Sequence, residues 1–269
     1  MLSADDSARV IAGGQTLVPL MAMRLARPTR LVDIARIPGL AYIRDDGDAV
    51  TIGATTRQCV VESGPSVRIR LPLLHRAMPY VGHAATRARG TIGGSLANGD
   101  PAAEIVLAAV TLGASLHWRE GEKNSASDAA DFFLGPMLTA LPIAACLEAV
   151  RFPVWPESRL GTALHEVNAR QSDFAFVSAA AQVALDADGR CSRIAVGVGA
   201  ISATAFRLDM SALQGSRLEE AAVRAAVSAG LKDIEPLADL HASAGYRRRV
   251  AAKIAVRAIM DAARDAYAR

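Results

Sequence analysis

Two pairs of adjacent glycines, each beside a hydroxyl residue, constrain the fold of this 269-residue chain more than any other feature. The first pair lies in the run Ala12-Gly13-Gly14-Gln15-Thr16, between an apolar strand at 9–12 and a helical pattern at 17–25. The second lies in the run Thr91-Ile92-Gly93-Gly94-Ser95. Adjacent glycines tolerate positive φ and expose successive backbone N–H groups, so both segments are suited to close around a phosphate.

The ligand of these two segments is not specified by their spacing. The hydroxyls of Thr16 and Ser95 can each add a donor, and the basic residues Arg87 and Arg89 precede the second segment. Neither segment matches the GxGxxG dinucleotide motif or contains the Lys-Ser/Thr of a nucleotide triphosphate loop. Either pair is also typical of a plain turn between a strand and a helix. The pattern therefore indicates an anion or cofactor site of unknown kind.

The pattern of apolar residues predicts a mixed α+β protein of two domains. Strands are expected at 31–34 and 49–54, and helices at 63–82 and 104–112. Pro153 and Pro156 mark a change in character, so we expect a cofactor-binding domain at 1–156 and a smaller domain at 157–269. The second domain should contain an antiparallel hairpin, 177–185 with 192–198, and a terminal helix. That helix repeats an apolar residue every four positions, at Tyr246, Val250, Ile254 and Ala258.

Composition excludes several classes of protein. Hydrophobic residues make up 51% of the chain and charged residues 21%, which rules out a disordered or fibrous protein. The 30 Lys and Arg residues only slightly outnumber the 27 Asp and Glu residues and form no nucleic-acid-binding stripe. Cys59, Cys146 and Cys191 are too few and too scattered for a zinc or iron–sulfur site, and we expect them to be buried thiols. No membrane span or signal peptide is visible, so a cytoplasmic location is expected.

The residues around the two glycine pairs are more specific than their spacing. The segments Ile11 to Met21 and Arg24 to Pro28 closely resemble the first FAD loop of the carbon monoxide dehydrogenase medium-subunit family. The segment Arg87 to Glu104 resembles the second FAD loop of the same family. Weaker similarities lie at 135–136, 148–153, 165–175 and 246–248, so the resemblance extends over essentially the whole chain.

This resemblance implies a fold, a cofactor and partners. The fold would be the FAD-binding fold of the vanillyl-alcohol oxidase type, with two N-terminal subdomains that meet near 45–55, followed by the smaller domain. The chain would be the FAD-containing subunit of a molybdenum hydroxylase of the carbon monoxide or xanthine dehydrogenase type. Its partners would be a large molybdopterin subunit and a small iron–sulfur subunit. Electrons would pass from the clusters to FAD and on to an external acceptor.

The resemblance also assigns cofactor-binding residues, while it implies no catalytic residue and no metal ligand in this chain. The first segment would wrap the pyrophosphate and ribityl chain, the second would close the other side, and later residues would contact polar groups or the flavin ring. The expected contacts are Ala12, Gly13, Gly14, Gln15, Thr16, Leu17, Val18, Pro19, Val81, Thr91, Ile92, Gly93, Gly94, Ser95, Asp100, Glu104, Leu147, His165 and Phe174.

Several of these residues also have a purely structural interpretation. Asp100 is well placed to cap a helix that begins at Pro101, and Glu104 can be a solvated helix residue. His165 can be a hydrogen-bonded strand residue, and Phe174 can belong to the core. Residues 246–249 are a candidate contact for a partner subunit, although a run of arginines on a helix is usually solvated.

Two other functions remain open from the sequence. One is a self-sufficient flavin oxidase or dehydrogenase of the same fold, which lacks support because no added substrate domain or acid–base pair is visible. The other is a degenerate, non-enzymatic assembly subunit, against which the intact glycine pairs argue. Relatives have a further strand and helix before the first FAD loop, so we expect a smaller first subdomain here.

Overall fold

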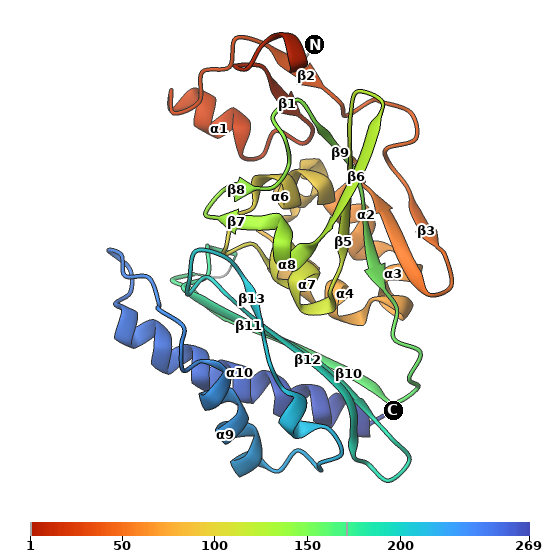
Figure 1. Cartoon of the computed structure of the whole chain (residues 1–269), viewed down its shortest axis with the longest axis vertical. Coiled ribbons are helices and arrows are strands. Elements are labelled where there is room, and N and C mark those ends of the chain that lie inside the picture. The colour runs from red at the N-terminus through yellow and green to blue at the C-terminus, as the bar shows by residue number, and fades with distance from the viewer. Residues whose placement is uncertain (1, 171) are drawn as a thin grey trace.

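The computed structural model describes residues 2–170 and 172–269 and contains four β-sheets flanked by helices (Figure 1). Met1 lies outside the described residues, as does Gln171 within the family-like segment 165–175. The chain runs from a small N-terminal sheet, through a central sheet with its helices, to a C-terminal sheet backed by two helices. The predicted mixed α+β architecture is confirmed.

The first unit is a short β–α–β segment. Strands β1 (Arg9–Ile11) and β2 (Leu31–Asp33) pair in parallel, with α1 (Leu17–Ala22) between them, after the 3₁₀ turn Leu2–Ala4. The helix ends three residues before the predicted Leu25. Arg24 adopts a left-handed φ of 60°, and the N–H of Leu25 turns back to the carbonyl of Leu20, which terminates the helix.

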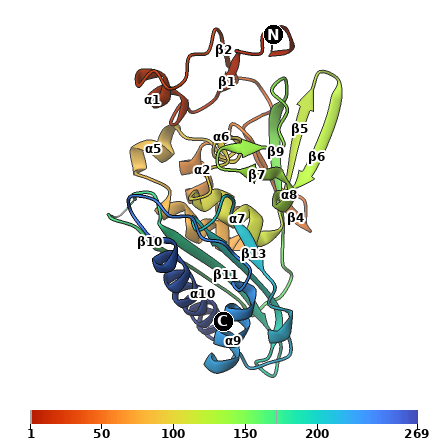
Figure 2. The ribbon, with the colours of Figure 1, turned by 60° about the vertical axis from the view of Figure 1, so that its left-hand side comes forward.

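The second unit is a five-stranded antiparallel sheet in the order β3-β4-β9-β5-β6. Figure 2 shows the β5–β6 hairpin projecting from the body of this unit. The hairpin and the small sheet β7–β8 were not predicted from the sequence. The strands are β3 (Ile43–Asp45), β4 (Ala49–Gly53), β5 (Ser115–Glu120), β6 (Lys123–Asp128), β7 (Phe133–Gly135), β8 (Leu138–Thr139) and β9 (Cys146–Pro153).

Short helices fill the chain between β4 and β5. The helix predicted at 63–82 is split into three pieces, because Pro65 and Pro72 each start a new segment and Leu71 leaves helical geometry. The helix predicted at 104–112 is confirmed as α7. The helices of this unit are α2 (Gln58–Ser63), α3 (Pro65–Arg70), α4 (Pro72–Ala77), the 3₁₀ turn Met78–Tyr80, α5 (Ala84–Arg89), α6 (Ile92–Asn98), α7 (Glu104–Leu112) and α8 (Ala129–Phe132).

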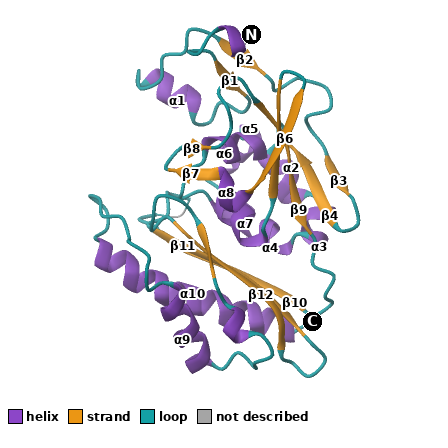
Figure 3. Ribbon diagram, in the orientation of Figure 1, coloured by secondary structure: helices purple, strands orange, loops and turns teal. Residues whose placement is uncertain are grey.

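The third unit is a four-stranded antiparallel sheet in the order β10-β11-β12-β13. Its helices α9 and α10 cover one face, and α4 and α7 of the second unit contact the other (Figure 3). Strand β11 is buried throughout because both faces are covered, and the predicted hairpin is confirmed as β11–β12. The elements are β10 (Leu160–Val167), β11 (Val177–Leu185), β12 (Cys191–Gly199), β13 (Phe206–Leu208), the 3₁₀ turn Ser211–Leu213, α9 (Glu220–Gly230) and α10 (Ala244–Tyr267).

The buried face of α10 differs from the predicted stripe. Of the four residues in the predicted stripe, only Ala258 is fully buried. Small residues such as Ala251, Ala255 and Ala262 form the buried face of the helix instead. The helix lies very close to β10, since a Cβ on Gly161 would stand 2.0 Å from the carbonyl oxygen of Ala262. Large side chains cannot fit at that distance, so alanine rather than isoleucine occupies the contact.

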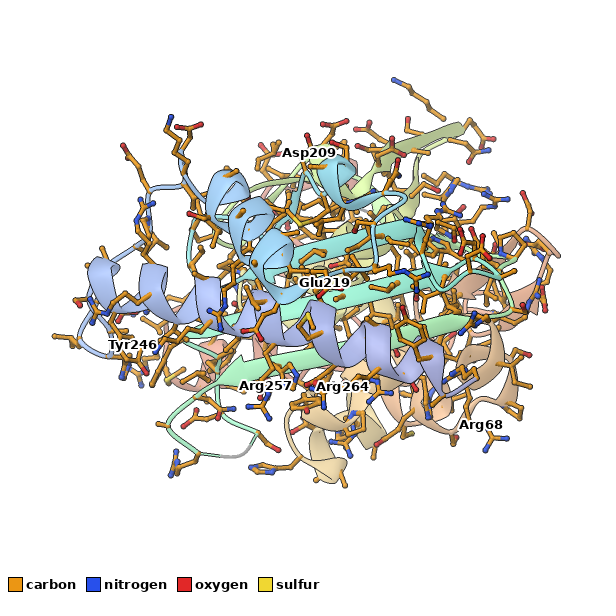
Figure 4. All side chains as sticks on the ribbon, turned by 90° about the horizontal axis from the view of Figure 1, so that it is seen from below. Arg68, Asp209, Glu219, Tyr246, Arg257 and Arg264 are labelled. Carbon is orange, nitrogen blue, oxygen red and sulfur yellow. The ribbon has the colours of Figure 1, made fainter. Side chains whose placement is uncertain are left out.

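The arginine run at the start of α10 is not a free surface. Tyr246 lies near one end of α10, far along the helix from Arg264 (Figure 4). Arg247 is 4% exposed and donates to the carbonyl oxygens of Phe176 and Ala200 and to Asp239. The prediction that this run as a whole is a solvated face or a partner contact is therefore wrong for Arg247, which ties α10 to the sheet.

Two further expectations can be compared with the described residues. Only Cys191 is buried as expected, whereas Cys59 and Cys146 are half-buried. Across 2–170 and 172–269, none of the helices combines the length and the apolar character that crossing a membrane requires.

Candidate cofactor site

The first glycine segment forms an open loop between β1 and α1. Gly14 has a φ of 71°, a conformation that glycine adopts without strain, and the loop is accessible to solvent. Within the described chain, the backbone N–H groups of Gly13, Gly14, Gln15 and Thr16 have no hydrogen-bond acceptor. The Thr16 hydroxyl caps no helix N–H. These groups are therefore available to a ligand.

The loop contacts the chain just before the second glycine segment. A Cβ on Gly13 would stand 2.4 Å from the carbonyl oxygen of Arg89 and 2.8 Å from the Cα of Gly90. The side chain of Arg57 donates to the same Arg89 carbonyl, and Arg57 forms an isolated bridge to Thr91. The two segments, far apart in sequence, thus meet at backbone contact distance, which only glycine at position 13 allows.

A cavity of about 530 Å³ opens beside the first loop. Arg36, Arg57 and Arg89 contribute positive charge to its lining, and Asp33 contributes one negative charge. A pyrophosphate carries two negative charges, which several guanidinium groups and unpaired N–H groups can compensate. The residues present therefore fit the pyrophosphate of FAD. The full lining is Ile11, Ala12, Gly13, Gly14, Gln15, Val18, Pro19, Asp33, Ala35, Arg36, Arg57 and Arg89.

The second glycine segment is not an open loop but the start of α6. The N–H of Ile92 donates to Thr56 O at 3.1 Å and that of Gly93 to Ala54 O at 2.9 Å. The N–H of Gly94 donates to the Thr91 hydroxyl at 3.0 Å, the N-cap arrangement. The prediction that this segment exposes successive N–H groups is therefore wrong, because helix capping and the carbonyls of the turn after β4 use them.

The two glycines of this segment have different roles. Gly93 is buried, and a Cβ there would stand 2.4 Å from the Cβ of Ala54, so close packing on the residue that follows β4 requires glycine. Gly94 is exposed, and a Cβ there would meet only the Thr91 hydroxyl, at 2.8 Å. Gly94 and Ser95 are the members of the segment that remain accessible to a ligand.

The two basic residues before this segment, Arg87 and Arg89, also have different roles. Arg87 donates to both carboxylate oxygens of Glu62, at 2.8 and 3.1 Å, and to the carbonyls of Val81 and Gly82. It holds α5 against α2. Arg89 is exposed and lines the cavity. Sequence analysis missed Arg36 and Arg57, which join Arg89 there only through the fold.

Asp100 and Glu104 lie between α6 and α7. Asp100 accepts a hydrogen bond from the N–H of Ala102, but α7 begins at Glu104 with Ala103 as its N-cap, so the expected capping of a helix at Pro101 is wrong. Glu104 is only 8% exposed, which excludes a solvated residue. Burial, together with the charges of Glu166 and Asp100, raises the pKa of the Glu104 carboxyl to about 7.

Neither His165 nor Phe174 lines the cavity beside the first loop. Along β10, Leu164 faces the core of the second unit, whereas Ala163 and His165 face α10. The Nε2 of His165 lies 2.8 Å from a carboxylate oxygen of Asp261 in α10, so the structure favours the hydrogen-bonded strand histidine. Phe174 is 71% exposed and is therefore not a core residue. Its contact with the flavin stays a prediction.

Val81 and Leu147 are buried in the core of the second unit, at 8% and 4% exposure. Both pack among its apolar side chains, and their assignment as cofactor contacts stays a prediction. The carbonyl oxygen of Val81 accepts a hydrogen bond from Arg87. Their apolar character offered no signal that would separate a cofactor contact from ordinary packing.

Comparison with protein families gives two matches that together span most of the chain. Residues 1–155 match the family described as the FAD binding domain in molybdopterin dehydrogenase. Residues 162–262 match the CO dehydrogenase flavoprotein C-terminal domain.

Individual relatives and solved structures agree with these families. The nicotine 6-hydroxylase medium subunit of Paenarthrobacter nicotinovorans is 35% identical, with 97% of this chain and 92% of the relative covered. The carbon monoxide dehydrogenase medium chain of Hydrogenophaga pseudoflava is 34% identical, over 94% of this chain and 88% of the relative. Quinoline 2-oxidoreductase from Pseudomonas putida 86 superimposes with a TM-score of 0.92 at 32% identity, covering 98% of this chain and 92% of the other.

The open loop, the arginine-lined cavity and these similarities lead to one conclusion. The chain belongs to the FAD-binding medium subunits of molybdenum hydroxylase-type oxidoreductases, the family of the carbon monoxide dehydrogenase medium chain.

Proposed function

We propose that this chain is an electron relay that acts only within a complex. Its FAD would take electrons from iron–sulfur clusters of a small partner subunit and pass them to an external acceptor. A large molybdopterin subunit would carry out the reaction on the substrate. The observation that carries the proposal is the first loop, whose unpaired N–H groups and neighbouring arginines suit the cofactor's pyrophosphate.

Relatives named as medium subunits or chains support the need for partners. Within the described residues no three His, Cys, Asp or Glu side chains form a group suited to a metal ion. Cys59, Cys146 and Cys191 are free thiols on separate elements. The chain's own residues would therefore bind and orient the flavin, and the redox chemistry would be supplied by the cofactor.

Two measurements test this function. Purification from the native host through a tag on this chain should recover a large molybdopterin subunit and a small cysteine-rich subunit. In the complex, rapid mixing with the substrate should bleach the flavin absorbance, whereas the isolated FAD-loaded chain should show no such change. Full activity of the isolated chain toward an alcohol or amine would instead identify a self-sufficient flavoenzyme.

A separate measurement tests whether the chain binds FAD. The site would be formed by the first segment, Ala12 to Pro19, with Gly94 and Ser95 at the start of α6. Titration with FAD should saturate at one FAD per chain and quench the flavin fluorescence. A chain that binds no FAD even with its partners present would be the assembly subunit left open by the sequence.

A further inference from the structure

Helix α1 has the composition of an interior helix but the position of a surface helix. Its six residues, Leu17–Ala22, are all apolar, yet none of them is buried. Helix α4 has the same length and buries four residues. Among the described residues, α1 makes no extensive contact with another helix or strand. Figures 1 and 2 both show it at the outer edge of the molecule. The chain therefore leaves the apolar surface of α1 without a cover.

The turn after α1 extends this apolar surface. Met23 is 61% exposed and Leu25 is 74% exposed, and Val18 on the helix itself is 51% exposed. The N–H groups of Leu25 and Ala26 both donate to the carbonyl oxygen of Leu20, at 2.9 and 3.2 Å, so the turn is fixed against the helix. Clustered apolar side chains on the surface of a folded protein are typical of contact sites for other proteins.

The charge around these side chains is positive. Arg24 and Arg27 are exposed, and Arg27 donates to the carbonyl oxygen of Arg24. Among the described residues, no carboxylate forms an ion pair with either guanidinium. The stretch 17–32 contains three arginines and no aspartate or glutamate. We call Val18, Met23, Arg24, Leu25 and Arg27 the α1 surface. Its charge is complementary to a protein face with an apolar centre and an acidic rim.

The composition of the α1 surface fits a permanent subunit better than a transient partner. Methionine and arginine are enriched in protein interfaces, whereas lysine, aspartate and glutamate are depleted, and the α1 surface follows this pattern. Permanent interfaces are also more apolar than transient ones. A second copy of this chain is a poor occupant, because a symmetric contact would bring Arg24 and Arg27 of both copies together and like charges repel.

The α1 surface is continuous with the cavity beside the first loop. Val18 belongs to both, since it is half-exposed and also lines the cavity. Met23, Leu25 and Arg27 do not line the cavity, so they can contact a protein while the loop holds a cofactor. A subunit seated on them would lie beside the cofactor site. A subunit that delivers electrons to the cofactor must approach it in this way.

We propose that the α1 surface is the docking site of the small iron–sulfur subunit, which meets it with an apolar patch rimmed by aspartate and glutamate. The contact covers Met23 and Leu25 and pairs Arg24 and Arg27 with carboxylates. The presence of that subunit rests on the proposed function. The choice of surface rests on the exposure and charge of α1 and of the turn that follows it.

Site-specific photo-crosslinking in the assembled complex identifies the occupant. The photo-reactive amino acid benzoylphenylalanine replaces Met23, and the complex is purified from the native host through a tag on this chain and irradiated. Mass spectrometry should find a crosslink to the small subunit. The same replacement at Ile69, which is 69% exposed on α3, is the matched control and should give none. A crosslink from position 23 to the large subunit or to a second copy, or no crosslink at all, would overturn the proposal.

Titration of the full chain with the purified small subunit measures the contact. Leu25→Asp places a negative charge in the apolar centre and should weaken binding by about 100-fold. Ile69→Asp makes the same change at a similarly exposed position and should have no effect. Arg27→Glu should weaken binding by about tenfold, and less at high ionic strength, while Arg27→Lys should keep most of the affinity. Because Leu25 is exposed, Leu25→Asp should unfold at the same temperature as the unchanged chain.

The outcomes separate this inference from the proposed function. If Leu25→Asp binds the small subunit as tightly as the unchanged chain does, the subunit docks elsewhere and the proposed function stands. An equal loss in Ile69→Asp would likewise overturn the choice of surface, because the effect would then come from net charge alone. If the unchanged chain recovers no cluster-carrying subunit from its host, the proposed function fails and this inference fails with it.

Discussion

The glycine pairs Gly13–Gly14 and Gly93–Gly94 resemble each other in sequence but use their backbone in opposite ways. Around the first pair the N–H groups have no acceptor in the described chain, and the loop opens onto an arginine-lined cavity. Around the second pair the N–H groups are used in capping α6 and in hydrogen bonds to the turn that follows β4. A glycine pair can thus be required either by a ligand or by packing. Substitutions should lower FAD affinity in the first case and the stability of the fold in the second.

The largest effect is expected from Gly13→Val. Its side chain would occupy the place of the Arg89 carbonyl, 2.4 Å from the Cβ position, and push the two segments apart. We expect FAD affinity to fall by about 100-fold, which corresponds to ~3 kcal/mol. Calorimetric titration with FAD measures this, and circular dichroism should show an intact C-terminal sheet. Gly245→Ala on α10, where a Cβ meets only a side-chain atom at 3.5 Å, is the control.

Substitutions at Gly93 and Gly94 should affect different properties, the stability of the fold at Gly93 and FAD binding at Gly94. Gly93→Ala forces a Cβ against Ala54 and should lower the free energy of unfolding by about 1–3 kcal/mol. Gly94→Val adds a side chain at an exposed position, so it should weaken FAD binding much more than folding. Urea unfolding and FAD titration of both variants provide the comparison. If Gly94→Val keeps full flavin occupancy, the start of α6 does not touch the cofactor.

The cavity arginines should have intermediate effects that depend on salt. Arg57→Gln and Arg89→Gln each remove one positive charge from the lining and should weaken FAD binding by about 1–2 kcal/mol. The loss should shrink as ionic strength rises, because the charges are accessible to solvent. Arg68→Gln, an exposed change on α3 (Figure 4), should leave the affinity unchanged. An equal loss for all three variants would mean that only net charge matters.

The smallest effects are expected at the hydroxyl residues. Thr91→Ala removes the N-cap of α6 and should cost about 1 kcal/mol of stability. Thr16→Ala removes no capping hydrogen bond, so it should leave stability unchanged and weaken FAD binding several-fold. Thermal unfolding and FAD titration distinguish the two outcomes. The comparison between the loops fails if Thr16→Ala destabilises the free chain as much as Thr91→Ala does.

Much of the second and third units follows from local pattern. Helix α7 and the hairpin β11–β12 were predicted closely, since their apolar runs and turn residues are strong local signals. The hairpin β5–β6 was missed because its second strand, Lys123–Asp128, is polar and largely exposed. The buried face of α10 was misassigned because the close approach of this helix to β10 depends on Gly161, a residue in another element.

For the site, sequence alone determined the residue types and the family, since the runs 11–21 and 87–104 are specific and contiguous. Tertiary structure alone decided how each residue is used. Whether an N–H is free depends on which carbonyl packs against it, and for Gly93 that carbonyl belongs to Ala54. Likewise, Arg57 reaches the cavity only through contacts between distant elements, and these contacts have no local signature.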